Sequence, residues 1–266
     1  MKIGIIGIGH LGRSFAKGLI KSGFNASDII ANARTLETFS KVKELFPGVI
    51  TTIDKAELIE KSDIIVIAVK PKDAVAALSG IADLDFAGKT IITFMAGITL
   101  KDMRKMLHDD AGTLKIVRVM PNVAISLCNG ITGISYDKDE KDIEEIIALF
   151  RRLGMVISLP EEELDTVTVC AGSGPAFAAY LMREYKNACN KMFKDEKISE
   201  EVAIRVFEST LQLMKEDKDN FNDVITKVAT KGGSTEKGIE KYEETDLTGI
   251  IYGGIEASYE RISKLK

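Results

Sequence analysis

Short β-branched runs alternate with amphipathic helical segments through about residue 158 of this 266-residue chain. This alternation constrains the fold more than any other feature, because it predicts a parallel sheet with helices packed on it. The run at residues 63–69 is apolar without alternation, which is typical of a strand covered by helices on both faces. We predict strands at residues 2–7, 28–31, 49–51, 63–69, 89–94, 115–119, 130–135 and 155–159.

The pattern changes after Pro160. The remaining residues contain almost no β-branched run of strand length, and they predict four or five helices. One of these helices is predicted to begin at Ser199 and to run to about Lys215. We therefore expect an α/β fold in two domains, a sheet domain over residues 1–160 and an all-helical domain over residues 161–266.

Composition and charge exclude several classes of protein. A formal net charge of −4 gives no basic surface for nucleic acid, and no apolar run reaches the ~18 residues of a membrane span. The three cysteines have no C-x-x-C spacing and only two histidines accompany them, so neither a disulfide scaffold nor a zinc site is expected. No secretory signal is expected before the first strand. We predict a cytoplasmic protein without nucleic-acid or membrane partners.

A glycine-rich turn, Gly-Ile-Gly-His-Leu-Gly, occupies residues 7–12. It follows a predicted strand and opens a predicted helix that runs to Lys21, which is the context of the dinucleotide-binding fingerprint. The three glycines permit the turn, admit a pyrophosphate to the backbone and let helix and strand pack closely, while the helix N-terminus attracts the phosphates. A tight turn without a ligand is the alternative. The candidate cofactor contacts are Gly7, Gly9, His10, Leu11 and Gly12.

The end of the second predicted strand carries Asn32 and Arg34. NAD-specific folds usually place a carboxylate here, about 20 residues after the glycines, to bind the ribose 2′-hydroxyl. A carboxylate would repel a 2′-phosphate, whereas arginine can pair with it through two hydrogen bonds. These two residues therefore predict a preference for NADP, with NAD as the second possibility. The alternative is an ordinary surface arginine at the start of a helix.

Three further strand ends carry unusual residues, at the sheet edge where open α/β folds bind their ligands. Small residues after the fifth strand leave room for a nicotinamide ring, and the other two ends offer polar side chains. Each set taken alone is compatible with a purely structural role, but three sets at one edge favour cofactor contacts. The candidates are Ala68, Val69, Lys70 and Pro71 after the fourth strand, Ala96 and Gly97 after the fifth, and Asn122 after the sixth.

The sequence Gly-Ser-Gly-Pro at residues 172–175 interrupts what would otherwise be one long helix from residue 161 to residue 191. Interior glycine costs about 1 kcal/mol and interior proline about 3 kcal/mol in a helix, so a kink or break is predicted here. A structural bend and a direct role at the nicotinamide are both compatible with this pattern.

A second glycine cluster, Lys231-Gly232-Gly233, leads through Ser234 and Thr235 into another predicted helix. Two glycines and two hydroxyls resemble a helix N-terminus that is stripped of side chains so that an anion can reach its N–H groups. A small carboxylate is the ligand that this pattern favours. The alternative is a plain loop in which Ser234 or Thr235 caps the helix.

These motifs, in this order, resemble the pyrroline-5-carboxylate reductase family, whose members catalyse the last step of proline synthesis. The resemblance runs over nearly the whole chain and rests on residues 7–12, 68–71, 118–122, 172–177 and 232–235. The first of these motifs is generic. The last two, with about 55 helical residues between them, are much more specific.

The resemblance implies an N-terminal Rossmann-type parallel sheet domain followed by an all-helical dimerisation domain. It also implies an oxidoreductase that passes a hydride from NADP(H) to the C=N carbon of 1-pyrroline-5-carboxylate and forms L-proline, in a homodimer or a ring of dimers. The substrate carboxylate is then expected at Thr230, Gly232, Gly233, Ser234 and Thr235. The hydroxyl of Thr235 would face the ring nitrogen and is the candidate catalytic group, although water could supply the proton.

The chain departs from the family at two motifs. Val123-Ala124 stands where members usually read Thr-Pro, and Thr230-Lys231 stands where they usually read Ser-Pro. With Lys231 in place of the usual proline, the loop lacks a residue that would stiffen it and gains a positive charge beside the expected carboxylate. Two alternatives therefore stay open, a reductase of a different cyclic imino acid and a non-catalytic dinucleotide-binding relative. β-Hydroxyacid dehydrogenases are disfavoured because no lysine follows the glycines at 172–174 until Lys186.

Overall fold

The computed structural model describes residues 1–33, 35–137 and 143–264. Within these residues eight strands form one sheet in the order β3-β2-β1-β4-β5-β6-β7-β8, and each lies where a strand was predicted. The strands are β1 (Ile3–Ile6), β2 (Ile29–Asn32), β3 (Ile50–Thr52), β4 (Ile64–Ile67), β5 (Thr90–Thr93), β6 (Lys115–Pro121), β7 (Gly130–Tyr136) and β8 (Gly154–Ser158).

The sheet is parallel except at one pair, since β7 runs antiparallel to β6. The predicted parallel sheet is confirmed with this one exception, and the reason for the exception is the length of the connection. Residues 122–129 join the two strands, whereas a parallel neighbour needs a crossover of about a dozen residues or more. The longer connection from β7 to β8 holds a helix, and that pair is parallel.

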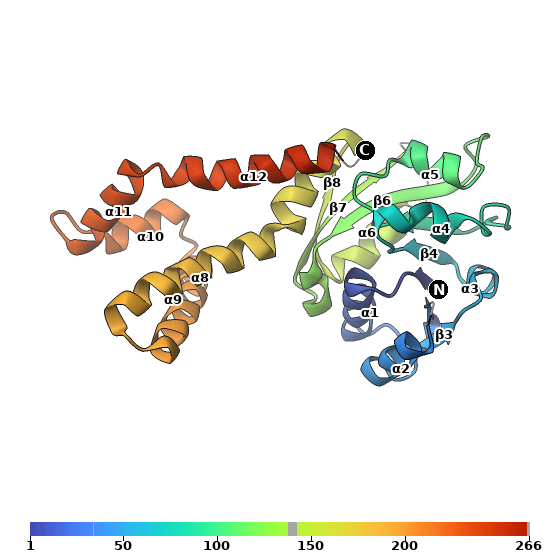
Figure 1. Cartoon of the computed structure of the whole chain (residues 1–266), viewed down its shortest axis with the longest axis horizontal. Coiled ribbons are helices and arrows are strands. Elements are labelled where there is room, and N and C mark those ends of the chain that lie inside the picture. Colours follow the sequence, from blue (N-terminus) through green and yellow to red (C-terminus); the bar gives the residue numbers. More distant parts are fainter. Residues whose placement is uncertain (34, 138–142, 265–266) are drawn as a thin grey trace. The chain divides into compact units, whose positions relative to one another are not determined.

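Helices cover both faces of the sheet, as the unbroken apolar strands predict (Figure 1). One buried cluster joins the sheet to α1, α2 and α6, and the other joins it to α3, α4 and α5. In the first cluster the rings of Phe15, Phe94 and Phe150 pack together, with centroids 5.3–6.1 Å apart. The helices are α1 (His10–Lys21), α2 (Leu36–Leu45), α3 (Lys55–Lys61), α4 (Ala74–Leu78), α5 (Leu100–Met106), α6 (Ile143–Arg151) and α7 (Leu164–Val167).

The chain divides into two compact units, Met1–Pro175 with Tyr259–Lys266, and Ala176–Ser258. The strands end near the predicted boundary at residue 160, but the first unit continues because α7 packs on β7. Gly133 makes this packing possible, since a Cβ there would lie 2.8 Å from the Leu164 side chain. Leu164 is thereby fully buried against the sheet.

The predicted break at residues 172–175 is a π turn, Thr168–Gly172, followed directly by α8 (Gly174–Phe193). The N–H of Ser173 donates to the carbonyl of Thr168 at 3.0 Å, which is the wide spacing of a π turn. Pro175 has no N–H for the carbonyl of Ala171, four residues earlier. The side-chain amide of Asn122 donates to that carbonyl instead, at 3.2 Å.

The second unit is helical (Figure 1). Among the described residues from 161 onward there are six α-helices, α7 to α12, which is one more than the four or five predicted, and the extra one is the single-turn α7. Tyr185 of α8 and Phe207 of α9 pack edge to face, with centroids 5.6 Å apart. None of the helices described is both long and apolar enough to cross a membrane. After α8 come α9 (Glu196–Asp217), α10 (Phe221–Val228), α11 (Ser234–Glu244) and α12 (Leu247–Ser263).

The predicted start of α9 at Ser199 was wrong by three residues. The helix begins at Glu196, because the carboxylate of Asp195 accepts hydrogen bonds from the N–H groups of Lys197 and Ile198. An aspartate in this position satisfies two of the donors that every helix start leaves free. Ser199 instead donates its hydroxyl to the carbonyl of Asp195 at 2.6 Å.

Candidate cofactor-binding and substrate-binding sites

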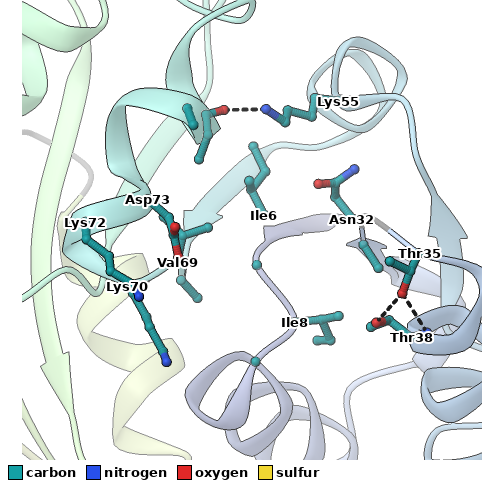
Figure 2. Close-up of a pocket in the computed structure, with 16 residues that line it drawn as sticks. Ile6, Ile8, Asn32, Thr35, Thr38, Lys55, Val69, Lys70, Lys72 and Asp73 are labelled. Carbon is teal, nitrogen blue, oxygen red and sulfur yellow. Dashed lines mark hydrogen bonds between the residues drawn. The ribbon is translucent and has the colours of Figure 1, made fainter.

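A pocket of about 580 Å³ opens at the carboxyl ends of β1, β2 and β4 (Figure 2). The chain order reverses between β1 and its neighbour β4, and such a switch point is where open α/β sheets bind ligands. Figure 2 shows Lys70 and Lys72 on one side of the pocket and Thr35 and Thr38 on the other. The lining residues are Ile6, Gly7, Ile8, Gly9, Asn32, Ala33, Thr35, Thr38, Lys55, Ala68, Val69, Lys70, Lys72, Asp73, Ala76 and Ala77.

The three glycines of the turn after β1 have the geometry that a bound pyrophosphate requires. Gly7 adopts a φ of 98°, which a residue with a side chain would hold only under strain. A Cβ at Gly12 would lie 2.3 Å from the carbonyl oxygen of Gly7, so only glycine lets α1 begin this close to β1. A Cβ at Gly9 would meet no atom within 4 Å, which leaves space for a ligand at the helix N-terminus.

The structure places six of the predicted cofactor residues in the lining of the pocket. Arg34 lies outside the described residues. Gly7, Gly9, Asn32, Ala68, Val69 and Lys70 line the pocket. His10, Leu11, Gly12, Pro71, Ala96, Gly97 and Asn122 are not among its lining residues.

Asn32 is buried at the pocket wall, where its side-chain amide donates to the carbonyl oxygens of Thr52 and Ile53 at 3.0 and 3.1 Å. These bonds tie the end of β2 to the end of β3. Asn122 likewise uses its amide within the protein. Its Oδ1 accepts from the N–H groups of Ala124 and Ile131, and its Nδ2 holds the π turn, so the structure gives Asn122 a positioning role.

Sequence reasoning missed several polar groups of the pocket, namely Thr35, Thr38, Lys55 and Lys72. Thr35 caps α2 by accepting from the N–H of Thr38, and the two hydroxyls lie 2.9 Å apart. A threonine before a helical run is a cap signal that could have identified it. Lys55 lies on α3 and donates to the carbonyl of Ala77 at 2.6 Å, a contact across 22 residues that no local pattern reveals.

The loop after β5 is held by hydrogen bonds where it meets α5. Gly97 has a φ of 75°, and Thr99 and Asp102 form a reciprocal capping box at the start of α5. Hydrogen bonds from the hydroxyl and the N–H of Thr99 lower the pKa of the Asp102 carboxyl below its ordinary value. The N–H of Leu100 donates to Oε1 of Glu161 at 2.7 Å, which fixes the loop to the segment after β8.

Oε1 of Glu161 also accepts from Nη1 of Arg118, at 2.9 Å. The Arg118 side chain is only 1% exposed, although it carries a full charge, and its Nη2 lies 3.6 Å from Oδ1 of Asp165. This buried cluster of Arg118, Glu161 and Asp165 joins β6, the loop after β5 and the start of α7. The prediction singled out the motif that contains Arg118 but assigned no role to this side chain.

The second predicted site lies at the start of α11. The N-cap is Gly233, which makes no side-chain capping bond, so the alternative in which Ser234 or Thr235 caps the helix was wrong. The first helical hydrogen bond runs from Lys237 to Gly233. Among the described residues no partner meets the N–H groups of Ser234, Thr235 and Glu236. A helix end with three free N–H donors can accept an anion.

Fold and pocket together define a dinucleotide-binding protein of the Rossmann type, followed by helices. Two family models match the chain. The model described as "NADP oxidoreductase coenzyme F420-dependent" matches residues 2–97, and the model described as "Pyrroline-5-carboxylate reductase dimerisation" matches residues 161–265. The pyrroline-5-carboxylate reductase of Aquifex aeolicus is 32% identical over 275 aligned residues, which cover 100% of this chain and 97% of that one. The chain belongs to the pyrroline-5-carboxylate reductase family.

Solved structures agree with this membership. A pyrroline-5-carboxylate reductase from Coxiella burnetii has a TM-score of 0.87 at 25% identity, over 100% of this chain and 98% of that one. The pyrroline carboxylate reductase of Plasmodium falciparum, solved with NADP bound, has a TM-score of 0.87 at 20% identity, with coverage of 100% and 98%. At that identity the second comparison shows the shared fold.

Proposed function

We propose that this protein reduces the C=N bond of 1-pyrroline-5-carboxylate to give L-proline, with NADPH as the reductant. The observation that carries the proposal is the 32% identity to a named reductase over the full length, because it spans both the glycine fingerprint and the helix start at Gly233. Residues 1–160 then serve as the dinucleotide-binding domain, and residues 161–266 as the helical substrate and dimerisation domain.

The residues after β1 and β4 fit the cofactor that the family implies. The open space at Gly9 and the N-terminus of α1 suit the pyrophosphate, and Lys70 adds a positive charge to the same wall. When bound, reduced NADP supplies the hydride for the C=N carbon. We extend the proposal to His10, Leu11, Gly12 and Pro71 as neighbours of the phosphates, and to Ala96, Gly97 and Asn122 as neighbours of the nicotinamide.

The start of α11 is proposed to hold the substrate carboxylate, through Thr230, Gly232, Gly233, Ser234 and Thr235. The free N–H groups of the first helical turn offer directed donors and a partial positive charge, which together favour a carboxylate. The reaction carbon of a protonated imine is already electrophilic. Positioning and fixed dipoles can therefore carry most of the catalysis without a metal or a strong acid.

Thr235 is the proposed catalytic residue. Its exposed hydroxyl makes no hydrogen bond to another described residue, so it is available to the ring nitrogen of a substrate bound at the adjacent N–H groups. Before the reaction the N–H of the protonated imine would donate to the Thr235 hydroxyl oxygen. After hydride addition the nitrogen is an amine with a lone pair, so it can also accept from that hydroxyl, and the contact would orient the nitrogen in both states.

Replacing Thr235 by alanine should lower kcat/KM for the imine by about 30-fold, the effect of losing one hydrogen bond in the transition state. Thr235→Ser keeps a hydroxyl and should stay within about threefold of the parent. Steady-state rates of NADPH oxidation measure both variants. Equal kcat/KM for the alanine variant and the parent would remove Thr235 from the mechanism.

The reaction itself is tested by NADPH oxidation with 1-pyrroline-5-carboxylate and, separately, with its six-membered homologue. Turnover of the five-membered imine supports the proposal. Turnover of the six-membered imine alone would assign a different cyclic imino acid, for which Val123, Ala124 and Lys231 are the first residues to examine. No turnover of either imine would favour the non-catalytic dinucleotide-binding alternative.

We propose that NADP is preferred over NAD, because Asn32 and Arg34 stand where a carboxylate would select the free 2′-hydroxyl. Thr35 and Thr38 lie on the same side of the pocket as Asn32 and add two hydroxyl groups there (Figure 2). Arg34→Asp should raise KM for NADPH by about tenfold and lower KM for NADH, since the new charge repels a 2′-phosphate. Unchanged Michaelis constants for both cofactors would refute this role of Arg34.

A homodimer is proposed through the helical unit, with a ring of dimers as the larger assembly. Helices α8, α10 and α11 bury none of their residues within the chain, although they are amphipathic. Exposed apolar side chains of the helical unit include Met192, Leu211, Phe221, Ile250 and Tyr252. A second copy would cover these apolar side chains, and a single-subunit mass in light scattering would contradict the proposed dimer.

The cytoplasmic location stays a prediction.

A further inference from the structure

The loop before α11 is a tight turn with an unusual residue at its second position. The N–H of Gly233 donates to the carbonyl of Thr230 at 2.8 Å, and Gly232 has a φ of 74°. Lys231 is not among the described residues with positive φ, so Thr230 to Gly233 form a type II turn. Proline is favoured at the second position of such a turn because it presets the backbone angle, and here that position holds lysine.

A side chain of the following helix fastens this turn. Oε2 of Glu236 accepts a hydrogen bond from the N–H of Gly232 at 2.7 Å. Glu236 is the third residue of α11, from which a glutamate can reach back to the backbone before the helix, as in a capping box. The turn is thus held by two hydrogen bonds, from Gly233 to Thr230 and from Gly232 to Glu236.

Through its bond to the Gly232 N–H, the same carboxylate brings a negative charge to the N-terminal end of α11. That charge is favourable for the helix, because it lies at the positive end of the helix dipole. It is unfavourable for an anion bound at the same helix end, because two neighbouring negative charges repel each other even in water. Glu236 therefore has two opposite effects on an anion at this helix start, since it shapes the loop and repels the ligand.

We infer that Glu236 is a positioning residue for the substrate carboxylate, which fastens the Thr230–Gly233 turn in the place of a proline at position 231. The inference rests on the proposed function for the identity of the ligand. The hydrogen bond between Glu236 and the turn does not depend on that function. A loosened turn would let Gly232 and Gly233 sample many conformations, and the free donors at the start of α11 would be presented to the substrate for a smaller fraction of the time.

Two variants that both lack the negative charge of Glu236 separate its hydrogen bond to the turn from its repulsion of the ligand. Glu236→Gln removes the negative charge but keeps an acceptor for the Gly232 N–H, so KM for the imine should fall by about threefold. Glu236→Ala removes the charge and the acceptor together, and its KM should be about tenfold higher than that of Glu236→Gln. In both variants kcat and KM for NADPH should stay within about twofold of the parent, because the reacting groups are unchanged.

The matched control is Glu240→Gln, one turn further along α11. The described contact of Glu240 is its ion pair with Lys237 at 2.7 Å, so this variant removes the same charge from α11 but leaves both hydrogen bonds of the turn in place. A second substitution provides a rescue. Lys231→Pro should restore a low KM in the Glu236→Ala background and change little in the parent, since proline presets the turn that Glu236 otherwise fastens.

Amide hydrogen exchange over residues 229–237 measures, without any substrate, how firmly Glu236 holds the turn. Glu236→Ala should speed exchange at Gly232 and Gly233 by about tenfold, and Glu236→Gln should leave it near the parental rate. Equal KM values for the alanine and glutamine variants, or equal exchange rates, would overturn the inference. If the parent turned over no cyclic imine, the proposed function would fail, and the exchange rates would still decide whether Glu236 fastens the turn.

Discussion

A Gly12→Ala variant is expected to bind NADPH about 100-fold more weakly than the parent and to unfold at lower denaturant concentration. The added Cβ would lie 2.3 Å from the carbonyl oxygen of Gly7, and backbone atoms cannot move aside as a flexible side chain would. The start of α1 would have to shift away from β1, which displaces the N–H groups that face the pocket.

Gly9→Ala supplies the matched control for this experiment. Its Cβ would meet no protein atom within 4 Å, so the variant should unfold like the parent. It should nevertheless lose affinity for NADPH, because the added methyl group fills the space into which a pyrophosphate must come. Fluorescence titration with NADPH and urea unfolding measure the two properties. Parental affinity in both variants would show that the turn after β1 does not hold the cofactor.

Arg118→Met is expected to lower the free energy of unfolding by about 3 kcal/mol or more, the usual effect of breaking a buried ion pair. Arg118 is 1% exposed, and its removal takes away the cation that lies 2.9 Å from Glu161 and 3.6 Å from Asp165. Asp165 is nearly as deeply buried, so its charge would stay in a poorly solvated site.

The stability of Arg118→Met can be compared with two further variants by urea unfolding. Arg118→Met with Asp165→Asn removes the second buried charge and should recover about half of the lost stability. Arg151→Met breaks only an exposed ion pair with Glu144, 3.9 Å long, and should change stability by less than about 0.5 kcal/mol. A loss for Arg118→Met as small as that for Arg151→Met would mean that the buried cluster does not stabilise the fold.

Much of the architecture was predictable from local sequence. The strands lie where β-branched runs predicted them, because each apolar run must be buried whichever strands and helices pack against it. The interruption at residues 172–175 was equally predictable, since a proline lacks an N–H in any helix. The start of α9 was missed because Asp195 and Ser199 both resemble caps, and the choice between them depends on which side chain reaches the free N–H groups.

The polar contacts around the sites were less accessible to sequence reasoning. Lys55 meets the carbonyl of Ala77 across 22 residues, and Asn122 meets the carbonyl of Ala171 across 49. Both pairs form only because the sheet brings distant loops to one edge. Asn122 was predicted as a cofactor contact from its position at the strand end, and that position alone does not tell which protein atoms its amide meets.

Local sequence was enough to predict the order of strands and helices and the glycine turn after β1, because each depends on the conformational preferences of a few adjacent residues. At residues 232–235 it left two alternatives, and the folded chain shows Gly233 as the N-cap. Which side chains meet was accessible only from the tertiary structure. Only the folded sheet could place the charge of Arg118 between Glu161 and Asp165, 43 or more residues away. The physical reason is that the free energy of such a pair depends on burial and distance, and both arise only after the chain has folded.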